Sequence, residues 1–326
     1  MAEPYPLTFE PILMEKVWGG RRLASYGKAL PDGVRIGESW ELADLDASSL
    51  SGAGGGAQRS VIFNGPFAGR TLFEAEASWG ERLFGRASPT PQGGFPLLVK
   101  LLDASENLSV QVHPPESEAD GRDSHAKHEC WYVLAAEPGS VIYKGLKPGV
   151  TRAELRDAIE AGRVPEVLAS VPAVPGEMHD VPSGTLHAIG AGVVIAEIQT
   201  PSDTTYRVYD WSAEHGRTPR EMHIEQALRC ADFAPPPPVR SGEILCDNAF
   251  FRVREVRGHC EERPLGTGCQ VAMIVGGSGA SIASRASSFA EVEGGAGTTI
   301  LVPASCADDA VLRAGPGTVC LVAELV

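Results

Sequence analysis

The stretch LSVQVHPPESEADGRDSHAKHECW, which spans residues 108–131, decides the expected fold. In its first part, Gln111 and His113 alternate with valines, which is the pattern of a strand with one apolar face. Lys127 and Glu129 repeat this alternation after the intervening loop. We predict two strands that pair across the loop and bring Gln111, His113 and Glu129 to one point. An amide oxygen, an imidazole and a carboxylate form a plausible zinc shell that lacks one ligand.

The segment VPSGTLHAIG, residues 181–190, supplies a candidate for the missing ligand. Pro182 and Gly184 predict a tight turn, and His187 enters the next strand directly after it. This P-x-G-x-x-H arrangement resembles the second metal motif of cupin barrels. We therefore predict that His187 completes the shell.

Two other histidines remain alternative ligands. His128 has the wrong parity relative to Glu129, and His125 lies in a polar loop, so both fit less well. Zinc is the metal that we expect, one ion per chain, because the predicted ligands are nitrogen and oxygen donors and nothing indicates redox work. The predicted ligands are Gln111, His113, Glu129 and His187.

Three further charged residues are candidates for catalysis. Glu197 lies in the strand after His187, and Arg207 follows ten residues later. Each could instead serve a structural ion pair, and Lys127 could be a surface lysine. We favour the functional interpretation because an arginine is always charged and binds enediolate or phosphate oxygens with a fixed fork of donors. Lys127 shares a strand face with Glu129 and would point into the same pocket.

Many short apolar segments separated by turns predict a mainly β protein, built as barrels or sandwiches. Residues 95–104 form a continuous apolar run that predicts a fully buried strand, and the glycine-rich residues 51–58 predict a loop. Four consecutive prolines at 235–238 predict a stiff linker. We expect a metal-binding domain over 1–234 and a second β-barrel-like domain without a metal site over 239–326.

Helices are expected at three places in the first domain. Periodic apolar residues predict one over 71–84. A capping box of Thr151 and Glu154 begins a second, which covers 151–162. Thr218 as N-cap, with a proline after it, predicts a third over 218–230.

Composition excludes several classes of partner. The 326 residues carry a formal net charge of −14, which argues against general binding to nucleic acid or to anionic membranes. The N-terminus lacks the features of a signal peptide, and the apolar segments are too short to span a bilayer. Seven scattered cysteines without a CxxC pair fit a reducing compartment, so we expect a cytoplasmic protein.

Taken together, these segments resemble the mannose-6-phosphate isomerases (phosphomannose isomerases) of the short bacterial type, within the cupin superfamily. The resemblance covers about residues 1–232, and the remaining tail is similar only in length and strand character. The segments that carry it are VWGG (17–20), GESWELADL (37–45), NGPFAG (64–69), FPLLVKLLDASENLSVQVHP (95–114), KHECWYV (127–133), VPSGTLHAIG (181–190), the stretch from Glu197 to Arg207, and GRTPREMHIEQAL (216–228).

The resemblance implies a cupin (jelly-roll) barrel and the same four zinc ligands. It also implies that Arg207 is the catalytic arginine and that Ser109, Lys127 and Glu197 line the active site. Longer family members carry a lysine soon after this arginine that is thought to meet the substrate. Here that lysine is absent, and we consider Arg217 its substitute in binding the phosphate.

The implied reaction interconverts mannose 6-phosphate and fructose 6-phosphate through a cis-enediolate. Arg207, Glu197 and Lys127 are the predicted catalytic residues, and Glu197 is our first candidate for the base. A zinc-bound water or a histidine is an alternative base. Two other functions stay open: a metal-dependent cupin oxygenase and a non-catalytic sugar-binding cupin. We expect a monomer or a weak homodimer.

Overall fold

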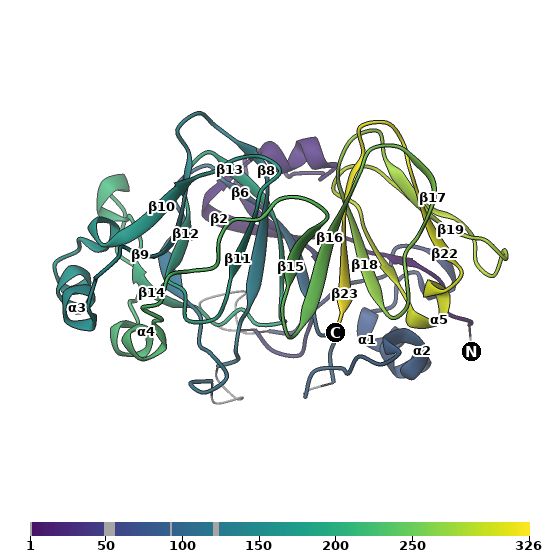
Figure 1. Cartoon of the computed structure of the whole chain (residues 1–326), viewed down its shortest axis with the longest axis horizontal. Coiled ribbons are helices and arrows are strands. Elements are labelled where there is room, and N and C mark those ends of the chain that lie inside the picture. The colour runs from purple at the N-terminus through teal and green to yellow at the C-terminus, as the bar shows by residue number, and fades with distance from the viewer. Residues whose placement is uncertain (1, 49–55, 92, 120–123) are drawn as a thin grey trace.

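The computed structural model describes residues 2–48, 56–91, 93–119 and 124–326, and it is mainly β, as predicted (Figure 1). The predicted loop at 51–58 lies mostly outside these residues. Four sheets, numbered here I to IV, account for nearly all of the strands. The segments that build sheets I and II come from the first two-thirds of the chain, and most of sheets III and IV comes from the last third.

Sheets I and II form the part of the molecule at the left of Figure 1. Their facing sides pack together through Trp131 and Ile195 of sheet I and Ile142 and Ile189 of sheet II. In spatial order, sheet I contains β11 (Met178–Val181), β8 (Glu129–Ala136), β13 (Val193–Gln199), β6 (Leu98–Ala104), β3 (Ile36–Leu42) and β2 (Ile12–Gly20). Sheet II contains β10 (Leu168–Pro172), β9 (Val141–Leu146), β12 (His187–Ile189), β7 (Val110–Val112) and β14 (Tyr206–Tyr209).

The alternation predicted for the strands of residues 108–131 is present, but the predicted pairing is wrong. The strand β7 pairs with β12 and β14 in sheet II, whereas β8 pairs with β11 and β13 in sheet I. Each strand has hydrogen-bonded neighbours on both edges, so β7 and β8 cannot pair with each other. They belong to different sheets, and the connection between them runs from sheet II to sheet I. The two strands therefore face each other across the interior of the sandwich.

Sheets III and IV form the other part of the molecule, and sheet III packs against the second face of sheet I. Tyr132 and Ile198 of sheet I meet Phe251 and Leu321 of sheet III. Sheet III contains β1 (Leu7–Thr8), β21 (Thr299–Val302), β18 (Gln270–Gly276), β23 (Val319–Leu325), β16 (Phe251–Arg257) and β15 (Ile244–Asp247). Sheet IV contains β17 (Cys260–Pro264), β22 (Ala310–Ala314), β19 (Ala280–Ser284) and β20 (Val292–Gly294), and a short separate ladder joins β4 (Asp44–Leu45) to β5 (Gln58–Arg59).

The sheets therefore stack in the order II, I, III, IV, and sheet I is buried on both faces. All seven residues of β6 are buried, which confirms the strand predicted within 95–104. The two parts of the chain are interleaved, because β1 pairs with β21 although it comes from the N-terminus. The domain boundary at 234–239 stays a prediction.

Two predicted helices agree closely with the structure. The helix α3 (Arg152–Glu160) begins with the predicted capping box, in which Thr151 and Glu154 exchange hydrogen bonds. The helix expected over 71–84 is two pieces, α1 (Leu72–Trp79) and α2 (Glu81–Phe84), with Gly80 at positive φ between them. Short helical segments that were not predicted are α5 (Ala304–Ala307) and the 3-10 turns η1 (Arg22–Tyr26), η2 (Gly65–Phe67), η3 (Val164–Glu166) and η4 (Ala213–His215).

The helix predicted from Thr218 begins later, because α4 spans only Ile224–Cys230 and its N-cap is His223. The backbone N–H of Arg220 donates to the carboxylate of Asp210, and the N–H of His223 donates to the carbonyl of Arg207. These bonds hold residues 217–223 alongside β14 and prevent the capping box. None of the described helices is both long and apolar enough to cross a bilayer.

Candidate metal centre and pocket

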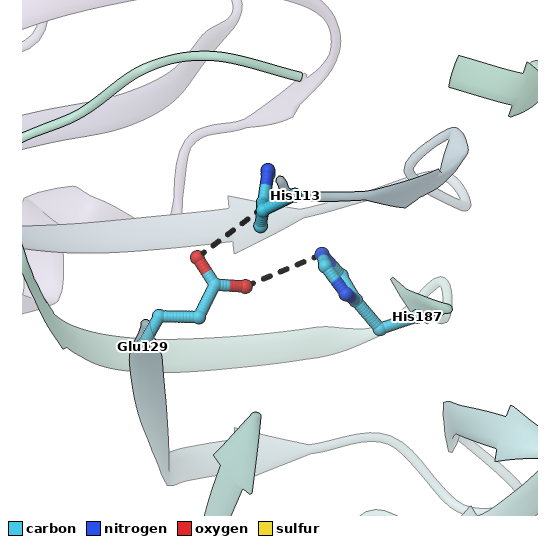
Figure 2. Close-up of side chains that lie close together, drawn as sticks. All are labelled: His113, Glu129 and His187. Atoms are coloured by element: carbon cyan, nitrogen blue, oxygen red, sulfur yellow. Dashed lines mark ion pairs between the residues drawn. The ribbon is translucent and has the colours of Figure 1, made fainter. Parts of the chain in front are cut away.

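Three of the four predicted ligands lie together in the interior between sheets I and II. His113 directly follows β7, and His187 and Glu129 are the first residues of β12 and β8. The Nε2 atoms of His113 and His187 lie 3.6 and 3.3 Å from the two carboxylate oxygens of Glu129 (Figure 2). All three side chains are at most 1% exposed, and one ligand atom from each lies within 4.8 Å of the others.

Both imidazoles are oriented by backbone carbonyls. The Nδ1 of His113 lies 2.7 Å from the carbonyl of Thr204, and the Nδ1 of His187 lies 2.8 Å from the carbonyl of Thr185. Because a carbonyl only accepts, each Nδ1 carries the proton and each Nε2 presents a lone pair. Metal-binding histidines have this arrangement, so the two residues fit a metal ion.

The electrostatics of the cluster also fit a cation. Burial, reinforced by the charge of Lys127, lowers the pKa of His113 to about 3, and burial lowers the pKa of His187. Burial alone would raise the pKa of Glu129, but the positive charge of Lys127 holds that pKa well below its usual range. The cluster thus offers one carboxylate and two neutral imidazoles. Among the described residues, the Nε2 of His187 and the Oε1 of Glu129 are buried without a hydrogen-bond partner.

Gln111 lies beside this cluster in the register of sheet II. Its Cα pairs with that of His187 on one side and with that of Arg207 on the other. Val110 and Val112 face the opposite way and pack among residues of α3 and α4. Gln111 therefore has the backbone position expected for a fourth ligand, and its role as a ligand stays a prediction.

Lys127 links the cluster to a chain of alternating charges. Its Nζ lies 2.6 Å from Glu129, 3.2 Å from the Nε2 of His113 and 3.6 Å from Glu197. Burial would lower the pKa of Lys127, but the carboxylates of Glu129 and Glu197 raise it above its ordinary value. Lys127 is therefore a permanent cation at the edge of the metal centre.

The series of alternating charges continues from Glu197 along sheet I. Glu197 lies 3.4 Å from Lys100, its cross-strand partner on β6, and Lys100 lies 3.9 Å from Glu38 on β3. Glu38 in turn pairs with Lys16 at 3.3 Å. Burial raises the pKa of Glu197 despite the two neighbouring lysines. A buried carboxyl with a raised pKa beside a metal centre is suited to accept and return a proton.

A polar pocket of about 320 Å³ adjoins the metal centre. Five of the predicted site residues line it: Ser109, Gln111, Lys127, Glu197 and Arg207. The pocket is also lined by Glu15, Lys16, Val17, Trp18, Glu38, Trp40, Lys100, Leu102, Leu108, Asp203, Thr205 and Arg220.

Arg207 is buried on the sheet II side of this pocket. One of its guanidinium nitrogens donates to the carbonyl of Glu221 at 3.2 Å, while its Nε has no hydrogen-bond partner among the described residues. Burial and the nearby charge of Arg220 lower the pKa of Arg207 to about 10. A cation of this kind is available to an anionic ligand.

Three predicted or alternative residues lie elsewhere. Arg217 is not among the pocket residues, because its guanidinium binds the carboxylate of Glu106 at 2.8 Å. His128 binds Asp180 at 2.8 Å on the other side of β8, and His125 lies in the loop before β8, apart from the three-residue cluster.

Sequence reasoning missed Glu38, Lys100 and Arg220. Lys100 had a usable signal, because it lies in a segment expected to form a fully buried strand, where a charged residue needs a partner. Glu38 lies in a segment that was used only for the family resemblance. Arg220 had no such signal, since it was assigned to a helix that does not form there.

Comparison with known proteins agrees with this fold and site. Residues 9–142 match the family described as phosphomannose isomerase type I, catalytic domain. The mannose-6-phosphate isomerase ManA of Bacillus subtilis is 38% identical over 228 residues, which cover 68% of this chain and 67% of ManA. The chain therefore belongs to the mannose-6-phosphate isomerase family, as the sequence motifs predicted.

Solved structures extend the likeness beyond the matched segment. The crystal structure of the mannose 6-phosphate isomerase from Bacillus subtilis superposes with a TM-score of 0.79 at 26% identity, over 98% of this chain and 99% of that one. A mannose 6-phosphate isomerase in a holo, zinc-bound form has the same fold, with a TM-score of 0.72 at 18% identity, over 98% of this chain and all of that one (100%). This confirms the predicted fold class over both parts of the molecule.

Proposed function

We propose that the protein interconverts mannose 6-phosphate and fructose 6-phosphate with one zinc ion. The observation that carries this proposal is a buried cluster of two histidines and one glutamate beside a pocket that contains Glu197, Lys127 and Arg207. Membership of the family supports the choice of substrate.

The ligands that we propose for zinc are His113, Glu129, His187 and Gln111. Two neutral imidazoles, one carboxylate and one amide oxygen match the donors that zinc accepts, and the neutral ligands leave the ion with net positive charge. When bound, zinc would act as a Lewis acid that stabilises negative charge on the substrate's oxygens. Its presence in a relative of the same fold is consistent with this choice.

Glu197 is our proposed base. The reaction needs a proton to leave C2 of the open-chain aldose, to give a cis-enediolate, and to return at C1 to give the ketose. Glu197 lines the pocket, and its raised pKa makes it a stronger base than a solvent-exposed carboxylate. The same carboxyl then holds the proton between the two steps.

Lys127 and Arg207 are proposed to stabilise the charge that develops on the substrate. Both are cations with little exposure, and electrostatic stabilisation is strongest where water is excluded. Ser109, on the same strand face as Gln111, is proposed to bind a substrate hydroxyl. These roles assign a function to each polar residue predicted at the site, apart from Arg217.

We further propose a cytoplasmic enzyme. All seven cysteines are free thiols, which fits a reducing compartment. A monomer or weak homodimer stays the expected oligomeric state.

A coupled assay tests the proposed function. Purified protein is given mannose 6-phosphate, and the fructose 6-phosphate formed is converted through glucose 6-phosphate to NADPH. We expect sustained turnover and no consumption of oxygen. Oxygen uptake without formation of fructose 6-phosphate would identify an oxygenase, and binding of the sugar phosphate without turnover would identify a non-catalytic protein; either result contradicts the proposal.

A further inference from the structure

We propose that Gln199 is a positioning residue for the metal centre, because it holds the loop that fixes the orientation of the His113 imidazole. This inference rests on the proposed zinc site and concerns how the protein prepares that site for the ion. Gln199 does not line the substrate pocket. It acts through the carbonyl of Thr204, which lies 2.7 Å from the Nδ1 of His113.

Gln199 is the last residue of β13 and lies beside a proposed zinc ligand. Its Cα pairs with that of Glu129 on β8 and with that of Leu98 on β6. Directly paired residues of neighbouring strands share a face, so the side chains of Gln199 and Glu129 are on the same side of sheet I. The side chain of Gln199 is fully buried (0% exposed). A buried amide needs hydrogen-bond partners, and those partners indicate its role.

The partners of Gln199 are carbonyls of the loop that follows it. Its Nε2 donates to the carbonyl of Thr200 at 2.7 Å and to that of Ser202 at 2.6 Å. Carbonyls only accept, so the two bonds use both protons of the amide nitrogen. The loop is itself buried, because Thr200, Ser202 and Thr204 are at most 9% exposed. Bulk water is largely excluded there, and Gln199 supplies donors that a buried loop requires.

The same loop ends at the partner of His113. The backbone N–H of Thr204 donates to the hydroxyl of Ser202 at 3.2 Å, and that hydroxyl donates to the carbonyl of His125 at 3.0 Å. The position of Ser202 therefore constrains where the carbonyl of Thr204 points. Since Gln199 binds the carbonyl of Ser202, one short buried loop connects its amide to the imidazole of His113.

The two histidines of the cluster differ in how the partner of Nδ1 is held. Thr185, whose carbonyl binds His187, is two residues away from it in the sequence. Thr204, whose carbonyl binds His113, is 91 residues away. A local partner is placed by its own turn, whereas a distant partner must be held by other contacts. Gln199 should therefore affect His113 and leave His187 unchanged.

The unpaired oxygen of Gln199 argues against a role in packing alone. Its Oε1 is buried without a hydrogen-bond partner among the described residues. A buried acceptor that stays unpaired lowers stability, and an apolar side chain of the same shape would avoid this loss. The benefit lies at Nε2, whose two donors hold the loop carbonyls in place. Disturbing such an outer hydrogen bond of a metal-binding histidine typically weakens metal binding by roughly 10–100-fold.

The test compares Gln199→Met, which keeps the length of the side chain but removes its donors, with Gln270→Met. Gln270 on β18 is a matched control, since it is also fully buried (0% exposed) and its amide donates to the carbonyl of Thr267 at 3.4 Å. Nitrogen-15 NMR of the histidine rings in the metal-free protein reports which ring nitrogen carries the proton. Competition with a chelator measures the zinc affinity, and thermal melting verifies folding.

We expect His113 of the wild type to carry its proton on Nδ1, and Gln199→Met to shift that proton toward Nε2. His187 should keep its Nδ1 proton in every variant. The zinc affinity should fall by ~10-fold or more in Gln199→Met and stay within about twofold of the wild type in Gln270→Met. Ser202→Ala, a smaller truncation in the same loop, should change both readouts in the same direction, and it provides the test if Gln199→Met does not fold.

An unchanged His113 tautomer in the folded variant would overturn the inference, as would an equal loss of zinc affinity in Gln270→Met. A tautomer change at both histidines would also overturn it, since that result indicates a general loosening of the site. Turnover of the wild-type protein tests the proposed function separately. The expected tautomer shift and loss of zinc affinity in a protein without isomerase activity would reject the function and keep the positioning role. A wild-type protein that binds no zinc would reject both.

Discussion

The carbonyls of Thr185 and Thr204 determine which nitrogen of each histidine faces Glu129. Each accepts a hydrogen bond from an Nδ1, so both Nε2 lone pairs converge on one point. Lys127 holds Glu129 ionised at that point. The geometry and charge of the cluster thus come from six residues, two of which contribute only backbone.

Arg207→Ala should lower kcat/KM by at least ~10²-fold, the size of a single electrostatic contribution in a dry site. The zinc content should not change, because Arg207 lies across Gln111 from His187 and outside the ligand cluster. Steady-state kinetics and elemental analysis of the same samples check this. A parallel loss of zinc would instead give Arg207 a structural role.

Glu197→Gln should lower kcat by ~10²-fold or more, because general-base catalysis contributes on that order. The raised pKa of Glu197 also sets a pH dependence. A base must be deprotonated, so wild-type activity should fall as the pH drops through this raised pKa, and the variant should lack that acid limb. Glu15→Gln, which changes a pocket carboxylate outside the ion-pair chain, is the control. A variant that keeps the acid limb would exclude Glu197 as the base.

The convergence of these side chains was predictable, whereas the position of Arg220 was not. Alternation along a strand fixes which face a residue occupies, so Gln111, Glu129 and Glu197 could be assigned to one interior. Arg220 reaches the pocket through hydrogen bonds to Asp210 and Arg207, and a local pattern carries no information about such long-range partners.

At the level of elements, the turn before β12 connects the two histidines. The N–H of Gly184 donates to the carbonyl of His113 at 2.9 Å, and the carbonyl of Gly184 accepts from Asp232 at 2.8 Å. Gly184 has φ of +90°, and an added Cβ would lie 2.9 Å from the carbonyl oxygen of Cys230. This turn therefore requires glycine for its conformation and for its packing.

Gly184→Ala should destabilise the protein by ~1–3 kcal/mol and weaken zinc binding, since both histidines depend on this turn. Gly139→Ala is the matched control, because Gly139 has φ of +85° with open space around it. Chemical denaturation and zinc titration against a competing chelator measure the two effects. Equal destabilisation with unchanged zinc affinity in both variants would contradict a role for the turn in placing the ligands.

The prediction of helices and strands succeeded where the residues that determine the structure are close together in the sequence. The capping box of Thr151 and Glu154 forms as expected because all of its partners lie within one turn. The same kind of motif at Thr218 failed, since the backbone there has stronger partners on β14. The pairing of β7 with β8 failed because proximity in sequence does not determine which sheet a strand joins.

At the scale of the whole molecule, the metal site lies in a stack in which each sheet supports the next. Sheet I carries Glu129, Lys127 and Glu197 near its inner face and packs on sheet III with its other face. The buried pair of Lys28 and Glu41 also binds the carbonyl of Gly297 in the C-terminal part. The sequence could predict two β parts, but their shared core depends on contacts between distant segments.

Glu76 is a titratable group between the two parts of the molecule. It is buried on α1, near Asp44 of the N-terminal part and Cys269 of the C-terminal part. Burial and the charge of Asp44 raise its pKa to about 9. The folded protein therefore holds a proton that the unfolded chain releases above about pH 4.5, so stability should fall as the pH rises from about 5 to 9.

Glu76→Gln should flatten this dependence and stabilise the protein at pH 8 by ~2 kcal/mol or more, with little effect at pH 4. Glu81→Gln, at an exposed position in α2, is the control. Urea denaturation at several pH values provides the free energies of unfolding. A wild-type profile as flat as that of Glu76→Gln would contradict the buried neutral carboxyl.

We propose that isomerisation depends on one zinc ion held by the cluster of His113, Glu129 and His187. The most direct measurement removes the metal with a chelator and titrates zinc back while following turnover of mannose 6-phosphate. The stripped protein should have no activity, and activity should recover fully at one zinc per chain. The variant His113→Ala should not recover activity when zinc is added. Full activity after verified removal of all metal would contradict the proposal.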